Sequence, residues 1–112
     1  MEPSELGWLT RCVVLYESPP EARARVPEFF AAHSAYADEF RERHPGALLM
    51  IGPFPDAEDG QPGAMSIFTS RERAEEFAAS DPFVLNGVVT RWRVRVWFGP
   101  KIKRRSCPLW WS

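Results

Sequence analysis

The sequence predicts a single α+β domain in which strands and helices follow one another in the order β-α-β-β-α-β. Three observations lead to this prediction. The chain has 112 residues, enough for one domain with one core. Short runs rich in β-branched residues alternate with segments of helical periodicity, and glycine and proline mark the boundaries between them. This order is that of a ferredoxin-like fold with an antiparallel sheet.

The first strand is predicted at residues 8–17, WLTRCVVLYE, which are short, β-branched and bounded by glycine on one side and SPP on the other. Two starts are open for the helix that follows. Ser18 and Glu21 have the spacing of a capping box, whereas Pro27 fits the first turn of a later helix. We favour an irregular lead-in and a main helix from Pro27 to about Arg43.

The main helix has an apolar face. Apolar and aromatic side chains recur along it at intervals of three and four residues, and the charged ones fall mostly elsewhere. The recurring positions are Val26, Phe29, Phe30, His33, Tyr36, Ala37 and Phe40. His33 is therefore predicted to lie on the inward face.

The second half of the chain supplies the remaining elements. Residues 47–52 are typical of a buried strand, and a loop rich in Pro, Gly and Asp over residues 53–63 leads to a third strand at 64–70. Ser70 is a suitable cap for a second helix over residues 71–80. An Asp-Pro dipeptide is expected to end that helix.

The last strand, residues 90–98, has two different faces because its side chains alternate. One face carries Arg91, Arg93, Arg95 and Trp97, and the other carries Trp92, Val94, Val96 and Phe98. Two helices cover only one face of a four-stranded antiparallel sheet, so the other face needs a cover. A homodimer that pairs two such sheets supplies one.

The composition is that of an ordinary globular protein, with 45% hydrophobic and 26% charged residues and a formal net charge of −1. Residues 91–105 hold seven basic side chains and no acid. No groove-reading helix, zinc spacing or aromatic RNA-binding motif accompanies them, so nucleic acid is not an expected partner. We divide the chain into a domain at 1–98 and a basic tail at 99–112 that ends in PLWWS.

The sequence does not indicate a metal site, a redox motif, a secretion signal or a membrane span. Cys12 and Cys107 form no CxxC pair and have no histidine at metal-ligand spacing, so neither a metal site nor a redox motif is expected. The N-terminus has no basic region followed by an apolar one, and no apolar run approaches the ~18 residues of a membrane span. We therefore expect a cytoplasmic protein that does not cross a membrane.

Several motifs occur together and in order. They are His33 and Tyr36 within HSAYADEF, the GP dipeptide after the second strand, the run SIFTSRERAEEFAASDPFVLNGV and the final WRVRVWF. The most specific is the DPFxxxG pattern that begins at Asp81. Because of these motifs, the chain resembles the YciI-like (YCII-related) family over residues 13–98.

The resemblance implies a ferredoxin-like subunit that forms a dimeric α+β barrel, in the structural group of muconolactone isomerases and small cofactor-free monooxygenases. It also implies an active site made of a helix histidine and the aspartate of the DPF motif, which are His33 and Asp81 here. One branch of the family is similar to dehydrochlorinases that act on chlorinated hydroxyquinols.

This pair has a simple chemical interpretation. A histidine gains and loses a proton near neutral pH, and an aspartate within hydrogen-bond reach fixes the ring tautomer and leaves the other nitrogen for a substrate. No GxSxG motif or activated cysteine indicates covalent catalysis. We expect an enzyme without a cofactor that performs a lyase, isomerase or cyclase step on a small aromatic or quinone-like metabolite, in catabolism or natural-product biosynthesis.

Four further side chains are candidates for substrate contacts, namely Tyr36, Ser66, Phe83 and Trp92. Aromatic rings of this kind can wall an apolar pocket for a planar molecule, and ordinary core packing is the alternative. His33 can likewise be a satisfied core histidine, and Asp81 a turn residue that accepts backbone N–H groups.

Two other functions remain open. One is a ligand-binding or assembly module without catalysis that uses the pocket or the tail. The other is a cofactor-independent monooxygenase on the same barrel.

Overall fold

The structure, a computed structural model, describes residues 7–56 and 58–100. Four strands form one sheet: β1 (Trp8–Glu17), β2 (Leu48–Pro53), β3 (Ala64–Phe68) and β4 (Arg91–Pro100). They lie in the order β2-β3-β1-β4, and each neighbouring pair is antiparallel. The predicted ferredoxin-like α+β class is therefore confirmed.

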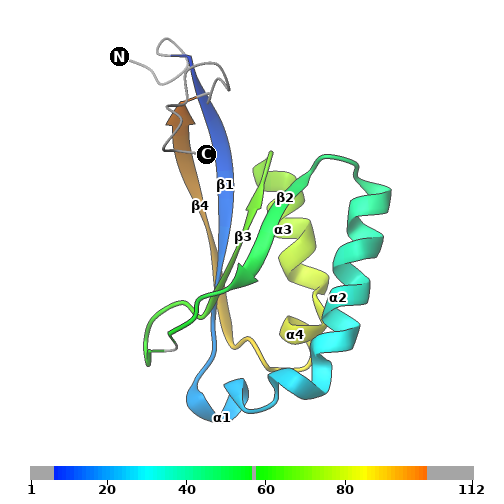
Figure 1. Cartoon of the computed structure of the whole chain (residues 1–112), viewed down its shortest axis with the longest axis vertical. Coiled ribbons are helices and arrows are strands. Elements are labelled where there is room, and N and C mark those ends of the chain that lie inside the picture. The colour runs from blue at the N-terminus through cyan, green and yellow to red at the C-terminus, as the bar shows by residue number, and fades with distance from the viewer. Residues whose placement is uncertain (1–6, 57, 101–112) are drawn as a thin grey trace, which may run out of the picture.

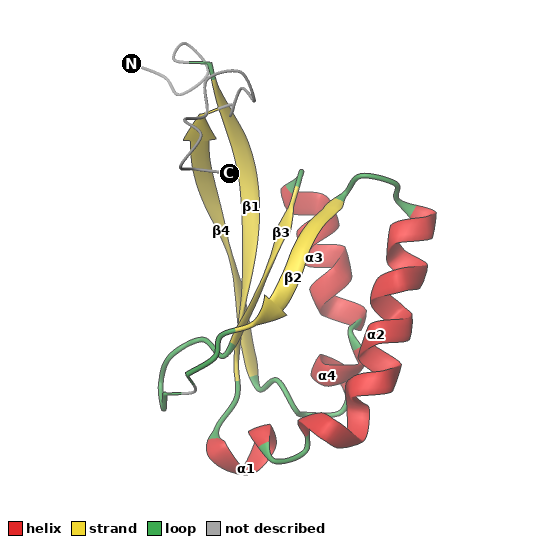
Figure 2. Ribbon diagram, viewed as in Figure 1, coloured by secondary structure: helices red, strands yellow, loops and turns green. Residues whose placement is uncertain are grey.

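Two long helices and two single-turn helices connect the strands: α1 (Pro20–Arg23), α2 (Val26–Arg43), α3 (Arg71–Ser80) and α4 (Pro82–Leu85). Both long helices lie against the same face of the sheet (Figures 1 and 2). None of the helices in the described part of the chain is long and apolar enough to cross a membrane.

The lead-in to α2 is more regular than expected, because it contains α1. The N-cap of α1 is Pro19, which makes no side-chain capping bond, so the capping box at Ser18 does not form. The main helix α2 begins at Val26, with Pro27 in its first turn. Proline suits that position because its fixed φ is helical and its missing N–H would have no partner there.

An aromatic cluster holds both long helices to the sheet. Phe40 of α2, Phe68 of β3 and Phe77 of α3 are fully buried, and their ring centroids lie 5.1 to 6.0 Å apart. Ring pairs at these separations add to the stabilisation from burial alone. The cluster therefore fixes the distance between α2 and α3, the two helices that carry the candidate site.

The opposite face of the sheet has no helix over it (Figure 2). The strand register pairs Val13 with Ile67 of β3 and with Arg95 of β4, and pairs Leu15 with Arg93. Residues paired in this way lie on the same face of the sheet. This open face thus has an apolar centre and arginines along β4.

β1 and β4 extend beyond the helices as a two-stranded ribbon (Figure 1). Their pairing runs from Trp8 with Pro100 to Glu17 with Arg91. β4 therefore continues to Pro100, past the predicted end of the strand at residue 98. The rest of the predicted tail, from residue 101 to 112, lies outside the described residues.

Candidate active site

Asp81 lies at the junction of two helices and is fully buried. It is the C-cap of α3 and the N-cap of α4, and its Oδ1 accepts a hydrogen bond from the backbone N–H of Phe83 at 3.0 Å. The Asp-Pro pair was expected to end a helix, and it also starts the next one. The reason is that the aspartate caps α4 while Pro82 fits its first turn.

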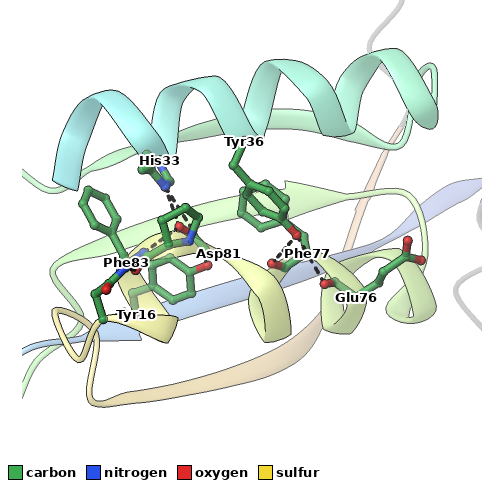
Figure 3. Close-up of polar contacts among 9 residues, drawn as sticks. Tyr16, His33, Tyr36, Glu76, Phe77, Asp81 and Phe83 are labelled. Atoms are coloured by element: carbon green, nitrogen blue, oxygen red, sulfur yellow. Dashed lines mark hydrogen bonds and ion pairs between the residues drawn. The ribbon is translucent and has the colours of Figure 1, made fainter.

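His33 reaches Asp81 from α2 (Figure 3). Its Nδ1 lies 2.9 Å from Oδ1 and 3.0 Å from Oδ2 of Asp81, and its side chain is 12% exposed. An ionised carboxylate only accepts hydrogen bonds, so Nδ1 carries the proton in this contact and Nε2 is the other ring nitrogen. The two residues meet because the aromatic cluster holds α2 against α3.

A third residue, Tyr16 of β1, contacts the same carboxylate. Its hydroxyl donates a hydrogen bond to Oδ2 of Asp81 at 2.7 Å, and the side chain is buried. Burial, and then the neighbouring carboxylate, raise the pKa of the Tyr16 hydroxyl, so it stays protonated and remains a donor. Strand alternation puts Tyr16 on the same face as the buried Val14, but it does not show what the hydroxyl meets.

Phe83 covers one face of the His33 ring. The two rings are stacked, with centroids 4.2 Å apart and an interplanar angle of 15°. Phe77 contacts the imidazole edge-on, with centroids 6.5 Å apart.

Gly87, the last residue of the DPFxxxG pattern, has a φ of 71°, a conformation that glycine adopts without steric cost. Each residue type in the motif thus has a local physical reason.

His33 lies on the wall of a cavity of about 500 Å³ between α2 and the strands β2 and β3. Most of the wall is apolar or aromatic, and a smaller part carries hydroxyl groups. The apolar part includes Val26, Phe30, Ile51, Phe54, Phe83 and Val88, and the hydroxyl groups are those of Tyr16, Ser18, Ser34 and Ser66. Apolar walls with a few polar groups are typical of sites for small molecules.

The family model of the YCII-related domain matches residues 10–98, which is most of the chain. The chain belongs to the YCII-related family. Its assignment from the motifs around His33 and Asp81 is therefore confirmed. Among curated proteins, none matches this chain.

This YCII-related chain is similar to a number of solved structures, among them the following two. One is 5-chloro-2-hydroxyhydroquinone dehydrochlorinase (TftG) from Burkholderia phenoliruptrix AC1100, in complex with 2,5-dihydroxybenzoquinone. It has a TM-score of 0.56 and 22% sequence identity, over 80% of this chain and 93% of that chain. The other is a nipsnap family protein from Agrobacterium tumefaciens, with a TM-score of 0.53 and 10% identity, over 86% of this chain and 92% of that chain. At such identities the likeness shows the fold.

The structure brings two of the four predicted contact residues of this YCII-related chain to the cavity. Ser66 and Phe83 line it, whereas Tyr36 does not. The Tyr36 hydroxyl donates a hydrogen bond to the backbone carbonyl of Phe77 at 2.9 Å and so joins α2 to α3. Burial, and then the negative charge of Asp81, raise the pKa of this hydroxyl to about 12.

The positions of Trp92 and Phe30 also differ from those predicted from the sequence. Trp92 lies outside the cavity lining, opposite Tyr16 in the strand register, and packs against the core. Phe30 was expected on the inward face of the helix, but it is 58% exposed at the cavity. Helical periodicity shows which side chains share a face, but not whether a second layer reaches that part of the helix.

The cavity wall also carries three charged side chains, Arg23, Asp38 and Arg41. Arg23 forms an ion pair with Asp59 at 3.0 Å, and Arg41 lies 3.8 Å from Asp38. Within residues 7–56 and 58–100, no three His, Cys, Asp or Glu side chains are placed to hold a metal ion. A histidine on such a wall, with one ring nitrogen bonded to a carboxylate, is chemically suited to proton transfer.

Proposed function

We propose that this protein is an enzyme without a cofactor in which His33 moves a proton on a small, planar, oxygenated metabolite. A lyase, isomerase or cyclase step in catabolism or natural-product biosynthesis is the concrete form. The observation that carries this proposal is the buried Asp81 carboxylate 2.9 Å from Nδ1 of His33, with the ring on the wall of a cavity.

The roles of the two residues follow from their hydrogen bond. Asp81 holds the proton on Nδ1, so Nε2 of a neutral His33 has a free electron pair that accepts a proton from the substrate. The imidazolium that results is stabilised by the carboxylate beside it. In an isomerisation Nε2 returns the proton to a different atom. In an elimination, the electron pair left on the substrate forms a double bond as the leaving anion departs.

The side chains that line the cavity support the proposal of a planar substrate with oxygen substituents. The rings of Phe30, Phe54 and Phe83 offer apolar surface, and the hydroxyl groups of Ser34 and Ser66 offer hydrogen bonds. The similar structure of TftG contains 2,5-dihydroxybenzoquinone. Hydroxylated quinones and hydroquinones are therefore the first compounds to test.

We expect the protein to bind 2,5-dihydroxybenzoquinone and to convert a chlorinated hydroxyhydroquinone with release of chloride and a proton, without consuming oxygen. Absorbance follows the ring, ion chromatography follows chloride, and an electrode follows oxygen. Binding without turnover of any compound in the panel would indicate a binding module, and oxygen uptake coupled to turnover would indicate a monooxygenase. Either outcome contradicts the proposed reaction.

A matched pair of variants tests whether the cavity is the binding site. Ser34 lines the cavity from α2, and the next residue, Ala35, is exposed on the same helix. Ser34→Trp should fill the cavity and weaken binding of 2,5-dihydroxybenzoquinone by about tenfold or more, whereas Ala35→Trp should not. Equal affinities in the two variants would place the ligand elsewhere.

We further propose that two chains pair through the open sheet face to form a dimeric α+β barrel. The support is an apolar strip on this face that no helix covers: Leu15 and Ile67 are half-buried, and Met50, which pairs with Ile67, is 66% exposed. Light scattering should give twice the 12.8 kDa mass of one chain.

A charge on the strip should break this homodimer. Ile67→Lys should give monomers because it places an unpaired charge in the interface, while Ala35→Lys, on the exposed side of α2, should stay dimeric. A monomeric wild-type protein, or a dimer that survives Ile67→Lys unchanged, would refute this interface.

A further inference from the structure

Three elements donate hydrogen bonds to the Asp81 carboxylate at once. The Tyr16 hydroxyl of β1 reaches Oδ2 at 2.7 Å, and the Phe83 backbone N–H of α4 reaches Oδ1 at 3.0 Å. Nδ1 of His33 in α2 lies 2.9 Å and 3.0 Å from the two oxygens. A carboxylate removed from water needs such donors to remain ionised. Together they fix the orientation of the carboxylate.

The hydrogen bonds from Phe83 and Tyr16 to the Asp81 carboxylate depend on different parts of the fold. The bond from Phe83 belongs to the N-cap of α4 and forms wherever that short helix forms. Tyr16 lies 65 positions away in the sequence and reaches the carboxylate from the sheet. Without it, only the Phe83 N–H, which bonds a single oxygen, would orient the carboxylate independently of His33 itself. The torsion that turns a carboxylate is broad, so a single bond holds it loosely.

Tyr16 lines the cavity, yet its geometry does not suit a direct acid. A tyrosine hydroxyl has one proton, and that proton is given to Asp81. Burial raises the pKa of the hydroxyl, and so does the adjacent carboxylate, so the proton is retained. The residue therefore acts on the carboxylate and through it on the histidine.

We propose that Tyr16 is a positioning residue whose hydroxyl locks the Asp81 carboxylate, so that His33 keeps its proton on Nδ1 and presents Nε2 to the cavity. That this positioning serves catalysis rests on the proposed function. The tautomer of His33 is nevertheless a property of the free protein, and it can be measured without a substrate.

The test is nitrogen-15 NMR of the histidine rings in Tyr16→Phe, at a pH where His33 is neutral. In the wild-type protein we expect the proton of His33 on Nδ1, with a sharp, slowly exchanging Nδ1–H resonance. In Tyr16→Phe the ratio of Nδ1–H to Nε2–H forms should fall, because a carboxylate that is free to turn holds the Nδ1 proton of His33 less firmly. The Nδ1–H resonance should broaden through exchange with water.

The chain provides two controls. The sequence has only two histidines and two tyrosines. His44, whose Nε2 lies 3.0 Å from Oε1 of Glu76, gives an internal reference in every spectrum. Tyr36→Phe removes the same hydroxyl group from a tyrosine that bonds a backbone carbonyl, so it should leave the His33 tautomer unchanged.

An unchanged tautomer ratio in a folded Tyr16→Phe protein overturns the inference and makes Tyr16 a structural residue only. If that variant does not fold, incorporation of 3-fluorotyrosine into Tyr36→Phe labels Tyr16 alone and keeps its hydroxyl. The more acidic hydroxyl should then shift the His33 Nδ1–H resonance, and an unmoved resonance also overturns the inference. If the tautomer responds while His33→Gln retains full turnover, the proposed function fails and the positioning role stands.

Discussion

Replacement of His33 by glutamine is expected to lower turnover by about 10²–10⁴-fold, the usual contribution of a general acid–base group. Glutamine keeps an N–H donor for the Asp81 carboxylate but cannot exchange a proton near neutral pH. The side chain of His33 makes its polar contact at 2.9 Å and packs on Phe83, so the fold should persist. The loss should appear in kcat with little change in KM, since a substrate-binding cavity remains. Steady-state kinetics and thermal unfolding measure the two effects.

His44 provides the control for this variant. It is the other histidine of the chain, it caps the C-terminal end of α2, and it does not line the cavity. His44→Gln should retain wild-type turnover. A His33→Gln protein with wild-type kcat would remove His33 from the reaction.

Substitution of Asp81 is expected to impair both folding and turnover. Asp81→Ala leaves the donors of Tyr16, His33 and Phe83 without an acceptor inside the protein, and each buried donor left in this way costs about 1–3 kcal/mol of stability. Asp81→Asn keeps the shape but directs an amide N–H₂ at another donor, so it should cost about 1–3 kcal/mol. Urea unfolding of the two variants measures both values.

The asparagine variant also tests the catalytic role. An amide cannot stabilise the imidazolium and lets the His33 ring take the other tautomer, so turnover should fall by about 10²–10⁴-fold even where the protein is folded. Asp38→Asn is a suitable control, because Asp38 lies on the cavity wall and only faces Arg41 at 3.8 Å. A stable Asp81→Asn protein with full turnover would reduce Asp81 to a helix cap.

Local patterns were sufficient to predict the order of the elements. β1 has the predicted bounds because turn residues mark both of its ends, and α2 begins within one residue of the predicted Pro27. The inward position of His33 followed from periodicity alone. Its contact with Asp81 did not, because that contact depends on how α2 packs on α3, and only the family resemblance pointed to the pair.

The cavity was the least predictable feature. Tyr36 shares the apolar face of α2 with His33, yet its hydroxyl bonds α3 and lies outside the cavity lining. The sequence did not indicate Tyr16 as a site residue, because a strand pattern assigns a side chain to a face of the sheet but not to a hydrogen-bond partner. Which side chains border an empty space depends on where β2 ends relative to α2, and that is a property of the packed layers.

The double role of Asp81 has a consequence for reading other members of the family. The same carboxylate caps α4 and holds the histidine ring, so it would stabilise this fold even in a protein without the proposed chemistry. The aspartate of the DPF motif therefore has a structural role in this chain that does not depend on the proposed chemistry. Under the proposed function, a histidine at the position of His33, on a different helix, is the more informative marker of the chemistry.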